Sequence, residues 1–149
     1  KKRWTRFFRS LEADTVFVVG AEIPTRGSDK YDNTMVSFGL DEEEKAVQRF
    51  PVPFSMYMPF KSIGANASPY SIGENTTMRV AGKKLGFLIC YEQFLAWPFL
   101  SLALTQPDMI VAPSNLWWCK DTSLPHIQTA SMRLWTALFG LPLVSAVNM

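Results

Sequence analysis

The stretch Leu85-Gly86-Phe87-Leu88-Ile89-Cys90-Tyr91-Glu92 decides how this sequence folds. It is an apolar run that ends at a cysteine, and a carboxylate follows two residues later. The run predicts a buried strand over residues 84–90, and the apolar segment after it predicts a helix over 95–105. A cysteine at the carboxyl end of a strand, on a tight turn into a helix, is held out of the sheet.

Such a turn favours a nucleophile at Cys90 for two reasons. The backbone N–H groups after the cysteine can face a developing oxyanion. The start of the helix favours the thiolate and would lower the pKa of the thiol, with Glu92 placed nearby. A free cysteine is also often a small buried apolar residue. The local residues therefore leave both interpretations of Cys90 open.

The elements around this stretch alternate in the order of an α/β domain. Strands are expected at 77–80, 84–90, 108–112 and 143–147, with a turn at Ala81-Gly82-Lys83 and a loop at 115–123. Helices are expected at 95–105, with Pro98 in its first turn, and at 125–139, ended by Gly140 and Pro142. Strand, strand, helix, strand, helix, strand predicts crossover helices and a partly parallel sheet.

The first half of the chain is less regular. It predicts an amphipathic helix over 1–12, a buried strand over 15–21 closed by Gly20, a turn over 25–31 and a strand over 33–40. An acidic loop at 41–45 and a polar loop at 62–75 flank a segment at 50–60 that holds three prolines. Those prolines exclude a helix, so this apolar segment is expected to pack on the core or to line a pocket.

Composition excludes several classes of protein. The chain has 149 residues, 48% hydrophobic and 19% charged, which is enough for one globular domain. A net charge of +2 is too small to indicate direct nucleic-acid binding, and no segment has the roughly 20 apolar residues of a membrane span. The single histidine, His126, excludes a His-rich metal site and is expected to cap a helix or lie at the surface. Cys119 lies in a Trp-rich loop, where packing is expected.

Leu88-Ile89-Cys90-Tyr91-Glu92 resembles the nucleophile motif of the carbon–nitrogen hydrolase (nitrilase) superfamily, and apolipoprotein N-acyltransferases in particular. Further segments resemble those acyltransferases in the same order, from about residue 13 to the end of the chain. These segments are Val19-Gly20-Ala21 with Tyr31-Asp32-Asn33, the 52–60 loop, Val111-Ala112-Pro113-Ser114-Asn115 with Trp117, the helix from His126-Ile127-Gln128, and 142–148.

The resemblance implies an α/β fold, the α-β-β-α sandwich of this superfamily. It also implies a cysteine nucleophile at Cys90, a glutamate general base and an oxyanion-binding lysine, with neither a cofactor nor a metal. The general-base glutamate would lie upstream of Lys1, because Glu22 has the wrong place in the order. Residues 1–149 are therefore expected to be an internal fragment of one domain, lacking parts at both ends and inactive by itself.

Three positions depart from the acyltransferase pattern. The lysine falls on Gln48, the loop glutamate on Met56, and a helix carboxylate on Leu138. We assign Arg49 as the oxyanion cation and Glu92 as a supporting carboxylate. Lys45 lies in the acidic loop and Lys61 lies beyond the proline-rich segment, so neither is preferred. The segment from Gln48 resembles the branch that contains the conjugal-transfer protein TraB.

The resemblance implies a cysteine-dependent hydrolase or acyltransferase that acts on an amide or acyl carbonyl of a small molecule or lipid. The protein would be a conjugal-transfer membrane protein whose membrane segments lie outside this chain, with this domain on the periplasmic side of the bacterial inner membrane. The alternative is a catalytically lapsed domain that serves as an assembly component of a conjugation apparatus. The substrate and the oligomeric state are left open.

Overall fold

A computed structural model describes residues 15–39, 44–53, 55–56, 67 and 76–149. The helix expected over 1–12, most of the acidic loop, and most of the 54–75 region lie outside the described residues. Lys45, which we placed in the acidic loop, begins strand β3.

The first sheet is antiparallel and has the order β1-β2-β3. Its strands are β1 (Phe17–Pro24), β2 (Tyr31–Phe38) and β3 (Lys45–Val47). The turn between β1 and β2 closes where the Thr25 N–H donates to the Lys30 carbonyl at 2.9 Å. The prediction of a buried strand closed by Gly20 is wrong in both respects. The strand continues to Pro24, and Val19 is 36% exposed, because β1 lies at the edge of the sheet that the described residues form.

The second sheet has the order β4-β5-β6-β7 and is partly parallel, as predicted. Strands β4 (Thr77–Val80) and β5 (Lys83–Phe87) form an antiparallel hairpin around Ala81 and Gly82, which both have positive φ. Strands β6 (Met109–Asn115) and β7 (Leu143–Asn148) continue the sheet in parallel. Strand β5 ends three residues before Cys90, which shortens the predicted strand.

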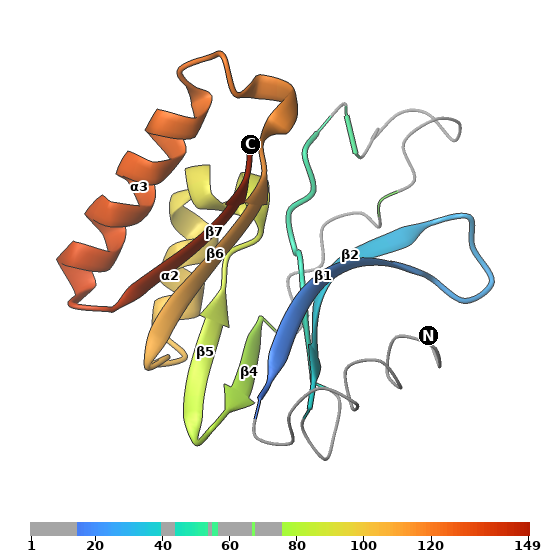
Figure 1. The fold of residues 1–149 in the computed structure, drawn as a ribbon, viewed down its shortest axis with the longest axis horizontal. Helices are drawn as coiled ribbons and strands as arrows, with labels where there is room; N and C mark the ends of the chain where they lie inside the picture. Colours follow the sequence, from blue (N-terminus) through green and yellow to red (C-terminus); the bar gives the residue numbers. More distant parts are fainter. Residues whose placement is uncertain (1–14, 40–43, 54, 57–66, 68–75) are drawn as a thin grey trace.

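Two helices form the crossovers of the second sheet. Helix α2 (Ala96–Ala103) carries Pro98 in its first turn, and α3 (Leu124–Phe139) ends at Gly140, whose φ is +63°. Figure 1 shows both helices on the side of this sheet away from β1 and β2. Gly86 in β5 lets α2 approach, because a Cβ atom there would lie 3.0 Å from the Leu102 side chain.

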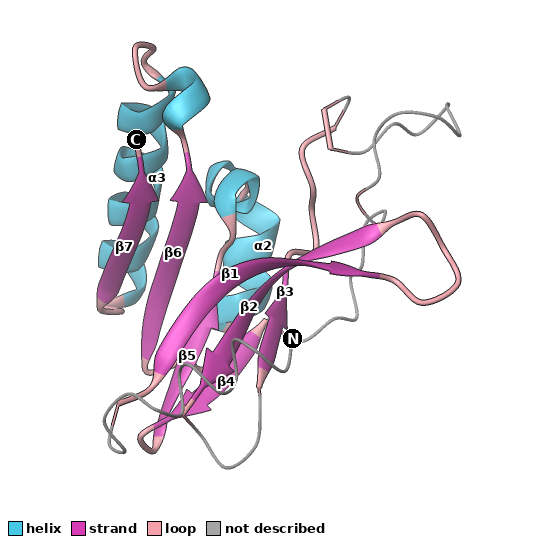
Figure 2. Ribbon diagram, turned by 45° about the vertical axis from the view of Figure 1, so that its right-hand side comes forward, coloured by secondary structure: helices cyan, strands magenta, loops and turns pink. Residues whose placement is uncertain are grey.

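Two apolar clusters separate three layers, which Figure 2 shows from a second angle. One cluster lies between the two sheets and contains Met35, Ala46, Met78, Phe87 and Ile89. The other lies between the second sheet and the helices and contains Leu88, Phe99, Leu102, Ile110, Ala112 and Met132. The described residues therefore form the helix, sheet and sheet layers of the predicted sandwich. Adjacent residues Leu88 and Ile89 face opposite layers, and Cys90 follows them.

Candidate active site

Cys90 begins a short 3-10 helix, η1 (Cys90–Phe94), directly after the extended residue Ile89. Its φ of +52° places a residue with a side chain in the left-handed region. That conformation costs roughly 1–2 kcal/mol for a non-glycine residue and persists where surrounding contacts enforce it. Cys90 is only partly buried. The structure thus puts the predicted nucleophile on a strand-to-helix turn, with a strained backbone.

Buried glutamine side chains hold the backbone at this turn. Three successive carbonyl groups, beginning two residues before the cysteine, each accept a hydrogen bond from a different glutamine: Leu88 O from Gln93 Nε2 at 2.9 Å, Ile89 O from Gln48 Nε2 at 2.9 Å, and Cys90 O from Gln128 Nε2 at 2.8 Å. These glutamines come from η1, from the segment after β3, and from α3. No local sequence pattern predicts this group of glutamines, because Gln48 and Gln128 lie far from their partners along the chain.

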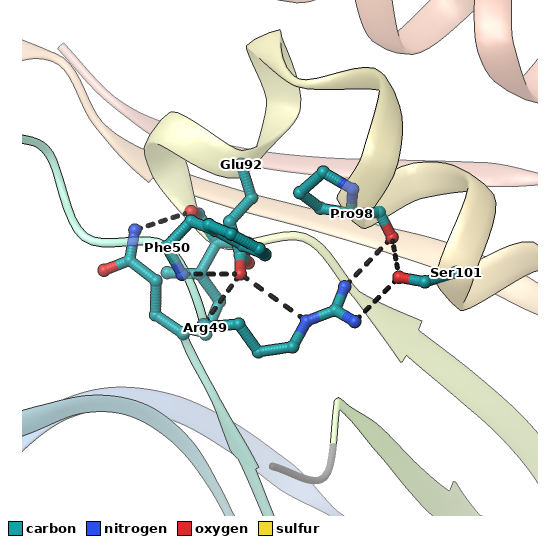
Figure 3. Close-up of polar contacts among 7 residues, drawn as sticks. Arg49, Phe50, Glu92, Pro98 and Ser101 are labelled. Atoms are coloured by element: carbon teal, nitrogen blue, oxygen red, sulfur yellow. Dashed lines mark hydrogen bonds and ion pairs between the residues drawn. The ribbon is translucent and has the colours of Figure 1, made fainter. Parts of the chain in front are cut away.

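Glu92 supports the same turn from the inside. Its carboxylate is fully buried and accepts the Ile89 N–H at 2.9 Å, the Arg49 N–H at 2.7 Å and the Phe50 N–H at 3.2 Å. Burial raises the pKa of Glu92 to about 7, although these N–H groups and the Arg49 charge oppose the shift. The carboxylate therefore joins the cysteine turn to the segment that follows β3, as Figure 3 shows.

The Arg49 side chain points toward α2. Its Nη1 donates to Ser101 Oγ at 2.8 Å and its Nη2 donates to the Pro98 carbonyl at 2.9 Å, while Nε lies 3.8 Å from Glu92 Oε1. Figure 3 shows the guanidinium between these groups. An oxyanion cation would instead point toward the Cys90 sulfur. These buried contacts favour a structural role, and the assignment of Arg49 as the oxyanion cation stays a prediction.

The environment of the Cys90 thiol differs from the sequence-based expectation. Burial raises its pKa above the ordinary value, and the charges of Cys119 and Glu92 raise it further. The backbone N–H groups of Asn115 and Tyr91 act on the thiol in the opposite direction. The predicted lowering of the pKa by the helix start is therefore outweighed, since desolvation disfavours the thiolate.

The other residues considered for the site lie at positions that are typical of structural or surface residues. Cys119 is buried at 3% exposure in η2 (Trp117–Cys119), and His126 is exposed in the first turn of α3. Glu22 is exposed on β1. Within the described ranges, no group of three or more His, Cys, Asp or Glu side chains could hold a metal ion. No helix of the described part has the length and apolarity needed to cross a membrane.

Comparison with solved structures identifies the fold of this chain. A carbon–nitrogen hydrolase from Helicobacter pylori matches with a TM-score of 0.76 and 19% identity, over 99% of this chain and 51% of that chain. A mutant of the amidase from Nesterenkonia sp. AN1 matches with a TM-score of 0.69 and 19% identity, over 98% of this chain and 51% of that chain. Its structure shows covalent addition of the acetamide moiety of fluoroacetamide at the active-site cysteine. The chain has the fold of the carbon–nitrogen hydrolase (nitrilase) superfamily.

Curated relatives show which proteins this sequence is similar to. The conjugal transfer protein TraB of Agrobacterium fabrum is 38% identical over 144 residues, which cover 91% of this chain and 32% of that protein. An apolipoprotein N-acyltransferase of Nitrosomonas europaea is 28% identical over 137 residues, which cover 84% of this chain and 27% of that protein. No protein-family model matches. The resemblance to the N-acyltransferases and to TraB is confirmed, and the chain spans 32% and 27% of the length of these two curated relatives.

Proposed function

We propose that this chain is part of a TraB-type conjugal-transfer protein in which Cys90 forms an acyl-thioester during amide hydrolysis or acyl transfer. The observation that carries the proposal is the left-handed turn at Cys90, with the N–H groups of Tyr91 and Asn115 acting on a partly exposed thiol. The covalent adduct on the active-site cysteine of the structurally similar amidase supports it. The domain would lie on the periplasmic side of the inner membrane, anchored by segments outside this chain.

In the proposed reaction, a general base takes the thiol proton and the Cys90 sulfur attacks the carbonyl carbon. The carbonyl electrons move to oxygen, and backbone N–H groups at the turn stabilise the oxyanion. The oxyanion collapses, the bond to the leaving amine or alkoxide breaks, and the base returns the proton to that group. Water or an amine then cleaves the thioester and restores the thiol. We propose that the base is a glutamate outside residues 1–149. Residues 1–149 would then form an internal part of one domain.

The test uses the full-length gene product and a p-nitrophenyl acyl ester. We expect a burst of p-nitrophenolate and an acyl adduct that peptide mass spectrometry locates on Cys90. Cys90→Ser should abolish the burst, whereas Cys119→Ser should retain it, because Cys119 is buried among packing residues. An adduct on Cys119, or an unchanged burst in Cys90→Ser, would contradict the proposal.

Alkylation provides a second check that does not need a substrate. We predict that iodoacetamide labels Cys90 before Cys119. Because burial raises the pKa of the Cys90 thiol, the rate should continue to rise with pH above the ordinary thiol value of about 8.5. The rates come from peptide mass spectrometry at several pH values. Labelling of Cys119 first would show that the thiol of Cys90 is not accessible.

A lapsed domain with an assembly role is the second candidate. One observation favours it: the position at which the lysine of the acyltransferases falls holds Gln48, whose neutral amide is bonded to Ile89 O and to Asn33 Nδ2. Conjugation frequency separates the two candidates. Cys90→Ala at equal protein level should reduce transfer strongly if thioester chemistry is required, and should leave it unchanged if the domain only assembles. Gln48→Lys should lower the pKa of Cys90 by placing a cation nearby.

A further inference from the structure

In the described part of the chain, strand pairing ends just before Cys90, where the Leu88 N–H donates to the Val111 carbonyl of β6 at 3.1 Å. Strand β5 ends at Phe87, and the carbonyl groups of the next three residues are bonded by glutamine side chains instead. Of these three bonds, the one from Gln128 acts on Cys90 itself. Gln128 lies 38 residues further along the chain, on the face of α3 that packs against the sheet. The reacting residue is thus tied to a helix of the outer layer.

The Gln128 amide is only half satisfied. The side chain is 2% exposed, and its Oε1 is buried without a hydrogen-bond partner among the described residues, while Nε2 donates to Cys90 O. A buried acceptor that lacks a partner costs about 1–3 kcal/mol. An apolar side chain of the same shape would avoid this cost. Among the described residues, the hydrogen bond to the Cys90 carbonyl is the contact of this amide that offsets the cost.

That conformation needs enforcement. A cysteine at φ +52° would lower its conformational energy by relaxing to the right-handed region, and it does so unless its neighbours prevent it. Rotation of this residue would move the thiol away from the Tyr91 and Asn115 N–H groups that favour the thiolate. A donor fixed to the Cys90 carbonyl opposes the rotation directly, since the carbonyl turns with ψ of the same residue.

We propose that Gln128 is a positioning residue, whose side-chain amide holds Cys90 in the left-handed conformation from α3. The proposal shares the Cys90 site with the proposed function, but it concerns geometry and does not require turnover. The titratable groups whose charges act on the Cys90 thiol are Glu92 from η1 and Cys119 from η2. On α3, His126 is the titratable residue nearest in sequence to Gln128.

The experiment measures the apparent pKa of Cys90 from iodoacetamide alkylation rates across pH, in the full-length gene product. Gln128→Met keeps the length of the side chain and removes the donor. We expect the apparent pKa to rise and the rate at pH 8 to fall by roughly threefold or more, because one pKa unit corresponds to a tenfold change in thiolate. Gln128→Glu should raise the pKa further, since an ionised carboxylate would repel both the Cys90 carbonyl and the thiolate.

Hydrogen exchange supplies a readout that separates positioning from packing. Exchange of the 88–94 backbone should accelerate in Gln128→Met, while exchange in β6 and β7 should stay unchanged. Gln106→Met and Gln106→Glu are the matched controls, because Gln106 is exposed after α2 and should alter neither measurement. Unchanged Cys90 pKa and unchanged 88–94 exchange in folded Gln128 variants would overturn the proposal.

If the Gln128 variants do not fold, the unsubstituted protein still tests the proposal. Native-state exchange of 90–94 should then have the same opening free energy as the first half of α3, because the two are joined. Opening of 90–94 at a clearly lower free energy would overturn it. A shifted Cys90 pKa in the variants, together with no acyl chemistry in the parent protein, would retain this proposal and remove the proposed function.

Discussion

Glu92 illustrates at the level of one residue how burial and hydrogen bonding compete. Three backbone N–H groups favour its carboxylate form, yet full burial outweighs them and raises the pKa to about 7. The folded state therefore holds a proton on Glu92 at pH values where the unfolded chain releases it. The stabilising contribution is complete below the ordinary glutamate pKa of 4.5 and is lost as the pH rises through about 7.

We predict that Glu92→Gln removes this pH dependence. Relative to the variant, the parent protein should lose on the order of 2–3 kcal/mol of unfolding free energy between about pH 4.5 and 7.5. Pulse proteolysis in urea at a series of pH values measures this difference in the full-length gene product. Parallel stability curves for the two proteins would show that Glu92 titrates normally.

Sequence patterns identified residues at this site better than they described their environments. The motif around Cys90 and Glu92 was readable, because the chemistry depends on residue type and local spacing. The direction in which the pKa of Cys90 shifts was not predictable from the sequence, because desolvation depends on neighbours from distant elements. The same reason hid Gln128, whose partner is 38 residues away.

At the level of elements, Arg49 connects the segment after β3 to the first turns of α2. Its guanidinium satisfies the Pro98 carbonyl and the Ser101 hydroxyl, and its side chain is 6% exposed. Burial lowers the pKa of Arg49 while Glu92 opposes the shift. Helix α2 is thereby fixed relative to the sandwich of sheets. This packing role does not require any contact with a substrate.

We predict that Arg49→Ala destabilises the protein by about 1–3 kcal/mol, because the buried Pro98 carbonyl and Glu92 each lose the guanidinium as a partner. Arg133→Ala, at an exposed position of α3, should change stability by less than about 0.5 kcal/mol. Pulse proteolysis measures both values. A stable Arg49→Ala protein that has lost its acyl chemistry would instead restore the assignment of Arg49 as the oxyanion cation.

Element order was predictable where apolar runs alternate with turn residues, and element ends were not. The helices expected at 95–105 and 125–139 occur as Ala96–Ala103 and Leu124–Phe139. The strand expected over 84–90 instead spans Lys83–Phe87, because Glu92 takes the Ile89 N–H that a longer strand would present to a neighbour. A side chain three residues away thus ends the extended region before Cys90.

For the whole molecule, local patterns indicated an α/β domain with a partly parallel sheet, and the family resemblance was needed to predict a sandwich. The reason is that layer stacking depends on which faces of the two sheets meet. Met35 on β2 and Phe87 on β5 meet in the core between the sheets, although 52 positions separate them in the numbering. Neither strand alone carries a signal for that partner.

The last prediction concerns residues 1–149 expressed alone. Strand β7 lies at an edge of the second sheet, and its Val144 and Val147 are 47% and 40% exposed. On the outer face of α3, Leu134 and Leu138 are 67% and 69% exposed. An open strand edge and exposed apolar side chains favour association with other copies.

We therefore expect concentration-dependent association in sedimentation velocity, without a reversible cooperative melt of a monomer. Leu134→Lys with Leu138→Lys should reduce the association through the helix face while the edge of β7 stays available. A monomer that melts cooperatively and reversibly would contradict the prediction, and with it the proposal that these residues are an internal part of a larger domain.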